Sequence, residues 1–455
     1  MPTTVPRPTD PPPPGPTATR TRRDGATGPG RRVCASLAGV TALLVAFAAV
    51  LLVAVLLSNL ARRTVLSTAV LFLAAGFLLG SGVTDVLPLA PEDDVVGTLA
   101  ELALFAVLFS DGMRAGWSDL RSAWRLPGRA LVLGLPLTLG VTAVLAHLLT
   151  DLSWVESLLL GAVLAPTDPV FAAALVGNER VPQRLRHLLN VESGLNDGLA
   201  LPFVLVLLSV ASGAEDLDLG TLAGELAVGL AIGVVVPLVA LKLEATRFFA
   251  ASKAYQPLTA VAIGLLVLGL GQATHGNLFL AAFAAGVTTA TVAPHHHEAF
   301  EEFGELVSEL LKLAALLVFG ALISPQFLGE IPLLGWVLAV AVIVVARPVA
   351  LFPSFLGTGL PVREQVAAAW FGPKGFASVV YGLLVLGSGV PASQELFHLV
   401  ALTIVLSVLA HSSTDVLVAR WFEGGSSGSG SGDGESGDGG TGDARGEVSD
   451  RPAAR

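Results

Sequence analysis

Residues 190–198, with the sequence NVESGLNDG, carry the side chains whose types and spacing could do chemistry. They place two carboxylates, Glu192 and Asp197, beside amides and a hydroxyl at the start of the apolar run 199–210. That run is long enough to complete a membrane-crossing helix. A charge at bilayer depth costs about 3 kcal/mol or more, so these acids are hypothesised to form a functional site.

The composition predicts a helical membrane protein. Of 455 residues, 53% are hydrophobic, 14% are charged and one is cysteine, which fits neither a soluble domain nor a disulfide-stabilised scaffold. The apolar runs are continuous, and in lipid the backbone must satisfy its own hydrogen bonds as a helix or a closed barrel. We therefore expect an all-α polytopic membrane protein that is not an enzyme and has no cofactor or nucleic-acid partner.

Thirteen apolar stretches are candidates for membrane-crossing helices. They lie at roughly 33–60, 64–82, 95–112, 127–149, 154–177, 186–211, 219–241, 255–272, 276–292, 305–323, 331–354, 364–388 and 394–419. Residues 1–32 are rich in Pro, Thr, Arg and Gly, and residues 420–455 are rich in Gly, Ser and Asp. Such segments cannot bury a core, so both are expected to be disordered tails around a transmembrane domain at 33–419.

Charged residues in the connections predict the orientation in the plasma membrane. Basic residues occur in alternate connections, as in 114–129 and 242–253, whereas the intervening connections hold acids such as Glu92 and Asp151 and no Lys or Arg. The positive-inside rule places the basic connections in the cytoplasm. Thirteen crossings then put the N-terminus outside and the C-terminus inside, although six arginines in the N-terminal tail oppose this orientation.

Two proline-containing segments interrupt the fifth and twelfth crossings. They are APTDP at 165–169 and GPKG at 372–375, and proline removes backbone donors that a regular helix needs. Counted from the cytoplasmic ends, Asp168, Lys374 and Asp197 all lie near the midplane. Paired interrupted helices are typical of transporter sites at the interface of inverted repeats, where helix ends bind a small cation. The alternative is a pair of harmless kinks.

Arg347 lies about as deep in its span as Glu192 does in its own, which predicts an ion pair between them. Pairing avoids most of the penalty that either buried charge would suffer alone. The alternative is that Arg347 marks the end of its helix and extends its charge toward water.

The two motifs GAVLAPTDPV at 161–170 and NVESGLNDG at 190–198 resemble the core of the monovalent cation/proton antiporters, specifically their electroneutral sodium/proton branch. The resemblance covers about 33–419. It implies thirteen helices in inverted repeats, with two broken helices that cross at the midplane. It also implies a homodimer in which a core, 127–211 and 331–419, moves against a scaffold, 33–112 and 219–323.

The resemblance also implies roles for single residues. Asp197 would bind either the cation or the proton, and Asn196 occupies the position that marks the electroneutral branch. Glu192 and Arg347 match the structural ion pair of the family. Lys374 stands where this branch usually has arginine and is similar to the electrogenic relatives. The remaining oxygen ligands of the cation would come from Thr167, Asp168 and Ser193.

The expected function is exchange of sodium, or else lithium or potassium, for protons, with no metal beyond the transported cation. A sodium-coupled solute symporter of similar architecture is the alternative, and an intramembrane aspartyl protease is disfavoured because its motifs are absent. Asp111 is either a residue of the cytoplasmic funnel or a charge at a span end. The cluster at His295–His297 is either a solvated loop or a proton sensor or metal ligand.

Overall fold

The computed structural model describes residues 29–61, 68–114, 126–168, 181–213, 219–246, 248, 252, 255–293 and 297–423. Every regular element in these ranges is helical, which confirms the all-α prediction. The elements are α1 (Pro29–Ala61), α2 (Thr68–Leu79), α3 (Asp94–Arg114), α5 (Pro127–Arg129), η1 (Ala130–Gly134), α6 (Leu135–Leu149), α7 (Trp154–Leu164), α9 (Gln183–Ala211), α10 (Leu219–Glu244), α11 (Gln256–Thr274), α12 (Leu278–Val292), α13 (His297–Leu322), α14 (Pro325–Glu330), α15 (Leu333–Ala341), η4 (Val342–Ala346), α16 (Arg347–Ser354), α17 (Val362–Trp370), α18 (Phe376–Gly387) and α19 (Ser393–Glu423).

Helices of the described chain coincide with all thirteen expected crossings. Seven are long and apolar enough to cross a membrane by length and composition, namely Gly39–Leu57, Asp94–Arg114, Pro127–Leu149, Gln183–Ala211, Gly220–Glu244, Leu333–Ser354 and Ser393–Phe422. Shorter apolar helices occupy most of the remaining positions, and α13 occupies the tenth. The predicted succession of crossings is therefore confirmed.

The first and last helices are longer than expected. α1 begins at Pro29 and α19 continues to Glu423, so four residues assigned to each tail are helical. Proline suits the first turn of a helix because the N–H that it lacks has no helical acceptor there. The last turn of α19 is held by packing, since the guanidinium of Arg363 lies 4.6 Å from the ring of Trp421. The rest of both expected tails lies outside the described residues.

Two pairs of crossings share local features. The fourth and eleventh crossings each contain a π-helical segment, η1 and η4, which ends two residues before Pro136 or Pro348. A proline ring clashes with the carbonyl four residues earlier, and a wider turn accommodates it. The fifth and twelfth crossings are both interrupted, after α7 and between α17 and α18. The matched features are those expected of a structural repeat.

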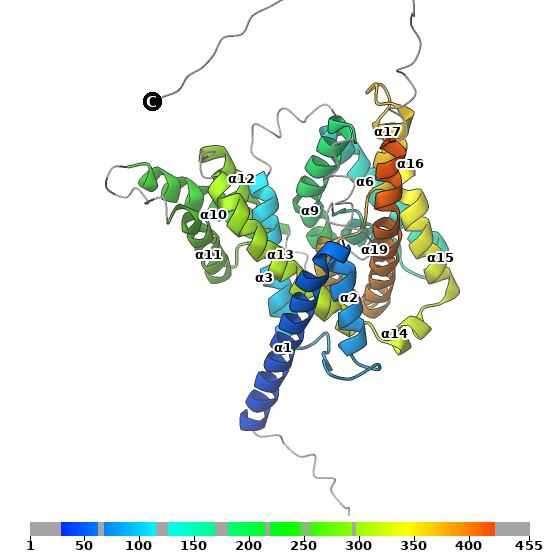
Figure 1. Ribbon diagram of the computed structural model, residues 1–455, viewed down its shortest axis with the longest axis horizontal. Coiled ribbons are helices and arrows are strands. Elements are labelled where there is room, and N and C mark those ends of the chain that lie inside the picture. Colours follow the sequence, from blue (N-terminus) through cyan, green and yellow to red (C-terminus); the bar gives the residue numbers. More distant parts are fainter. Residues whose placement is uncertain are drawn as a thin grey trace, which may run out of the picture.

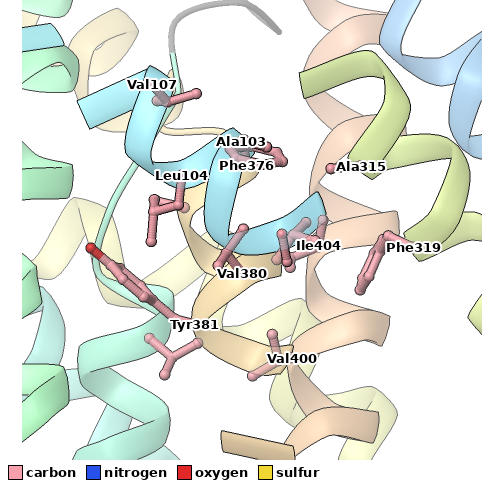
Figure 2. Packing of buried hydrophobic residues seen from close by; sticks show 14 of the residues in the cluster. Ala103, Leu104, Val107, Ala315, Phe319, Phe376, Val380, Tyr381, Val400 and Ile404 are labelled. Atoms are coloured by element: carbon pink, nitrogen blue, oxygen red, sulfur yellow. The ribbon is translucent and has the colours of Figure 1, made fainter. Parts of the chain in front are cut away.

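The helices pack in two sets. α2, α3, α10, α11, α12 and α13 contact mainly one another, and so do α6, α7, α9 and α15 to α19. Figure 1 shows α10 and α11 at one side of the molecule and α15 and α16 at the other. α3 and α13 join the sets, because their buried side chains meet those of α18 and α19, as Leu104, Phe319, Val380 and Ile404 do in Figure 2.

Glycines allow α3 and α12 to approach backbone to backbone. A Cβ atom on Gly112 would overlap the carbonyl oxygen of Phe283, and one on Gly286 would overlap the carbonyl oxygen of Phe109. Small residues permit such close packing in membranes, where lipid supplies no hydrophobic force to press helices together. Gly97, also on α3, has no atom within 4 Å of its Cβ position.

Substitution of Gly112 by alanine should therefore destabilise the protein by about 1–3 kcal/mol, because the two backbones must separate. Gly97→Ala is the matched control on the same helix, and it should be neutral or slightly stabilising because alanine favours helix. Denaturant unfolding in mixed micelles measures both changes. Equal stability of the two variants would contradict this packing argument.

Candidate functional site

The two interrupted crossings meet at residues 168 and 373. α7 ends at Leu164 and the chain leaves helical geometry before Asp168, whose backbone N–H donates to the carbonyl of Pro373 at 2.9 Å. In return, the backbone N–H of Phe376, the first residue of α18, lies 3.4 Å from Oδ2 of Asp168. The midplane contact of two broken helices is thus made by reciprocal hydrogen bonds. Residues 169–180, which would continue the fifth crossing, lie outside the described residues.

Glycines in the GPKG segment allow this contact. A Cβ on Gly375 would overlap the side chain of Asp168, and a Cβ on Gly372 would overlap the side chain of Arg347. The segment therefore does more than break a helix, because its two glycines admit two ionisable side chains. The sequence indicated the interruption but not these two contacts.

Polar groups of α9 face the interrupted chain of the fifth crossing. Nδ2 of Asn196 donates to Oγ1 of Thr167 at 2.7 Å and to its carbonyl oxygen at 3.2 Å. Because a carbonyl only accepts, the amide nitrogen must face Thr167. The Oγ atoms of Thr167 and Ser193 are 3.4 Å apart, and Oδ1 of Asn196 is buried with no hydrogen-bond partner among the residues that the structure describes. Buried polar atoms are usually bonded, so this oxygen is a candidate cation ligand.

Asp197 lies one residue further along α9 and is only 5% exposed. The charged groups close enough to act on its carboxylate are Asp111, Asp168 and Lys312. The sequence analysis did not include Lys312, a residue of α13, among the site residues. It had also missed Tyr381 of α18, whose hydroxyl donates to the carbonyl oxygen of Asp197 at 2.8 Å. A polar atom on an otherwise apolar face of α18 was the available signal.

The structure brings Glu192 and Arg347 together in the buried interior. Nη1 and Nη2 of Arg347 lie 2.8 and 3.0 Å from the two carboxylate oxygens of Glu192, which is bidentate geometry. Nε of Arg347 donates to the carbonyl of Ala368 at 3.2 Å, so the pair also joins α9 and α16 to α17. Helix-end snorkelling, the alternative, does not describe an arginine that is 4% exposed.

A second ion pair, absent from the sequence analysis, links α9 to α17 nearer their first turns. Nε and Nη2 of Arg184 lie 2.6 and 2.7 Å from the carboxylate oxygens of Glu364. The side chain of Arg184 is half exposed, whereas that of Glu364 is buried.

Lys374 does not reach the carboxylate of Asp168. It is 1% exposed, its Nζ has no hydrogen-bond partner within the described chain, and the charges that act on it are those of Arg347 and Glu192. The structure therefore does not pair Lys374 with Asp168, although the two residues are expected at similar depth. The backbone N–H of Lys374 instead donates to Oγ of Ser407 at 2.8 Å.

Asp111 is buried on α3, with Oδ1 3.5 Å from Nη1 of Arg114. Its burial does not fit an exposed charge at a span end, and its place in a cytoplasmic funnel stays a prediction. For the histidine cluster, His295 and His296 lie outside the described residues, and α13 begins at His297.

An all-helical chain with two interrupted helices crossing beside buried acids defines a polytopic membrane protein of the crossed-helix, inverted-repeat class. Residues 36–421 match the family model for the transmembrane sodium/hydrogen exchanger. The chain therefore belongs to the sodium/hydrogen exchanger family, which confirms the resemblance to the monovalent cation/proton antiporters. That family consists of transporters.

Individual relatives agree with this assignment. The chain is 27% identical over 362 residues to the K(+)/H(+) antiporter NhaP of Alkalimonas amylolytica, covering 77% of this chain and 62% of that protein. It is 26% identical over 379 residues to the K(+)/H(+) antiporter NhaP2 of Shewanella oneidensis, covering 81% and 65%. It thus spans less than two thirds of the length of these curated relatives.

The fold is similar to that of the sodium proton antiporter MjNhaP1 from Methanocaldococcus jannaschii, with a TM-score of 0.69 and 19% identity. This likeness covers 82% of the present chain and 98% of the other. At that identity it establishes the fold.

Removal of one partner of the Glu192–Arg347 pair should leave a buried charge without compensation. Glu192→Ala or Arg347→Ala should therefore lower the free energy of unfolding by about 3–5 kcal/mol. The double variant Glu192→Leu/Arg347→Met removes both charges and should recover most of that loss. Denaturant unfolding in mixed micelles measures the free energy of unfolding of all three variants. Single variants as stable as the parent would show that the ion pair does not stabilise the protein.

Proposed function

We propose that this protein exchanges a monovalent cation for a proton across the membrane. The observation that carries the proposal is the buried carboxylate of Asp197, beside Thr167, Asp168, Ser193 and Asn196, at the crossing of two broken helices. Sodium is the first candidate, and potassium is the second because two relatives are K(+)/H(+) antiporters. Membership of an exchanger family favours this reading over the sodium-coupled symporter.

Competition at Asp197 would couple the two flows. A single carboxylate holds either a cation or a proton, and an unneutralised one moved past an apolar barrier costs several kcal/mol. The loaded states therefore change sides and the empty state does not. In the cation-loaded state, hard oxygen ligands would come from the Asp197 and Asp168 carboxylates, the hydroxyls of Thr167 and Ser193, and the free Oδ1 of Asn196.

The helix set of 127–211 and 331–419 is proposed to be a core that moves against the scaffold, 33–112 and 219–323. Its support is the packing of the two sets mainly within themselves. In this arrangement Glu192 and Arg347 hold three helices of the core together as one body, and Asp111 of the scaffold faces the site. The protein is proposed to act as a homodimer in the plasma membrane, with the N-terminus outside and the C-terminus in the cytoplasm, as the loop charges indicate.

The exchange is proposed to be electroneutral, one cation for one proton. Asn196 cannot carry a proton, and its amide nitrogen is already committed to Thr167. Lys374 is the one group that would change this result, since a buried amine that released a proton in each cycle would add a second proton. The charges that act on Lys374 are those of the Glu192–Arg347 pair, and this supports a fixed role in the core.

Asp197→Asn should abolish exchange in reconstituted vesicles, because the site then has no proton to trade, while the protein folds as before. Dequenching of a pH-sensitive dye on addition of sodium, lithium or potassium measures the flux of the parent and the variant. Asp151→Asn, which changes an exposed acid in a connection, is the matched control and should keep full exchange. Cation-driven proton flux in folded Asp197→Asn vesicles would remove this residue from the role.

Electroneutral exchange predicts a reversal point that does not depend on membrane potential. Proteoliposomes carrying a potassium gradient, with and without valinomycin, are given graded sodium gradients, and proton movement is followed. The sample without valinomycin corrects for potassium that the protein itself transports. A reversal point that shifts with the imposed potential would mean electrogenic transport, and Lys374→Gln would then be expected to abolish the shift.

A further inference from the structure

The break between α17 and α18 separates a backbone donor and a backbone acceptor that a continuous helix would join by a hydrogen bond. In an unbroken α-helix the N–H of Lys374 would donate to the carbonyl oxygen of Trp370, four residues earlier. Here α17 ends at Trp370 and the N–H of Lys374 points elsewhere. A buried backbone donor or acceptor left alone costs about as much as a lost hydrogen bond, so both groups need new partners.

Two side chains of α19 supply those partners. Oγ of Ser407 accepts from the N–H of Lys374 at 2.8 Å, and Nε2 of His411 lies 2.9 Å from the carbonyl oxygen of Trp370. Oγ of Ser407 and Nδ1 of His411 are 3.1 Å apart. The two contacts of Ser407 are buried and the contact with Trp370 is partly buried, while Ser407 is fully covered and His411 is 1% exposed.

Hydrogen-bond accounting selects the histidine tautomer. Nδ1 also lies 2.6 Å from the carbonyl oxygen of Ser407, but that oxygen belongs to the continuous helix α19 and has a helical donor. The carbonyl of Trp370 has lost its helical donor and keeps only a turn contact from the N–H of Gly372 at 2.9 Å. A neutral imidazole has one N–H, and we assign it to Nε2 because the Trp370 carbonyl gains most from a donor. This assignment leaves Nδ1 as an acceptor 2.6 Å from the Ser407 carbonyl oxygen, a contact that opposes it.

In this tautomer the donors and acceptors form one directed chain. The N–H of Lys374 donates to Ser407, the Ser407 hydroxyl donates to Nδ1 of His411, and Nε2–H of His411 donates to Trp370. The chain begins and ends on the two backbone groups that an unbroken helix would have joined directly. A third polar residue of the same helix face, Thr414, accepts from Nε1 of Trp370 at 2.9 Å and fixes the end of α17.

We propose that Ser407 and His411 are positioning residues that replace the missing helical hydrogen bond with a side-chain bridge and so fix the shape of the break. The bridge acts through the next residues of the chain. Pro373 accepts from the Asp168 N–H and Phe376 donates to the Asp168 carboxylate, so movement of this segment moves Asp168. This inference rests on the proposed function, in which Asp168 is a cation ligand.

Amide isosteres test the bridge at His411. In His411→Gln the side-chain amide places an N–H donor near the position of Nε2 and keeps the hydrogen bond to the carbonyl of Trp370. In His411→Asn the shorter side chain reaches only the position of Nδ1, so the carbonyl of Trp370 loses this donor. The bridge also needs the Ser407 hydroxyl, which Ser407→Ala removes. Thr403→Val is the matched control, because Thr403 is a buried hydroxyl of α19 whose hydrogen bond within the described chain is to Leu399 of its own helix.

Hydrogen–deuterium exchange of the protein in nanodiscs, measured in peptides covering 370–376, tests the bridge independently of transport. Ser407→Ala and His411→Asn should speed exchange of the Lys374 amide about tenfold, in proportion to a lost hydrogen bond. His411→Gln and Thr403→Val should exchange like the parent. Parental exchange in Ser407→Ala and His411→Asn would overturn the bridge, and this holds even if the parent proved to transport no cation, which would refute the proposed function alone.

Transport kinetics test whether the bridge affects cation binding at the site. His411→Asn should raise the apparent KM for the cation about tenfold with little change in maximal rate, and His411→Gln should restore the parental KM. Thr403→Val should match the parent. A fall in maximal rate and in the yield of folded protein at unchanged KM would overturn positioning in favour of ordinary packing, as would equal kinetics of His411→Asn and His411→Gln.

Discussion

The contact between the two interrupted crossings is the constraint on which the rest of the structure depends. A bilayer offers no water to an unpaired N–H or carbonyl group, so a chain that leaves helical geometry at mid-depth must find each partner inside the protein. The N–H of Asp168 finds the carbonyl of Pro373, and Phe376 returns a donor to the Asp168 side chain. Each break satisfies part of the other, so neither is expected to keep its shape alone.

Side chains of neighbouring helices donate hydrogen bonds to backbone carbonyl groups near the two breaks. Arg347 donates to the carbonyl of Ala368, and Ser378 of α18 donates to the carbonyl of Val163 near the end of α7. The second of these bonds again links one broken crossing to the other. The helices around the site are therefore held by bonds to the breaks themselves as well as by apolar packing, which suits a core that moves as one unit.

Ionisable and polar groups at this depth fall into two kinds. Glu192 and Arg347 neutralise each other in bidentate geometry, and Arg347 also donates to the carbonyl of Ala368, which suits a structural role. Asp197, in contrast, is buried among other acids with Lys312 nearby, and Oδ1 of Asn196 has no partner within the described chain. A site that must release its ligand in every cycle needs groups of this second kind, because fully satisfied groups gain little from a cation.

The sequence by itself determined the class of fold and the composition of the site. Continuous apolar runs set the thirteen crossings because backbone groups must be satisfied within each helix, and the prolines at 166 and 373 set the two interruptions because proline lacks a donor. The depth count from the span ends was enough to match Glu192 with Arg347, since helical rise converts residue number into depth.

Only the tertiary structure decided which groups at one depth touch, because depth leaves rotation about each helix axis and lateral position undefined. Lys374 and Asp168 share a level, yet the turn at Gly372–Gly375 directs Lys374 toward Arg347 and Glu192. Lys312 and Tyr381 reach Asp197 from α13 and α18 through packing that no local pattern encodes. Ser407 and His411 read as isolated polar residues of an apolar span, and their role is defined by a break 33 residues away in the chain, brought beside them by the fold.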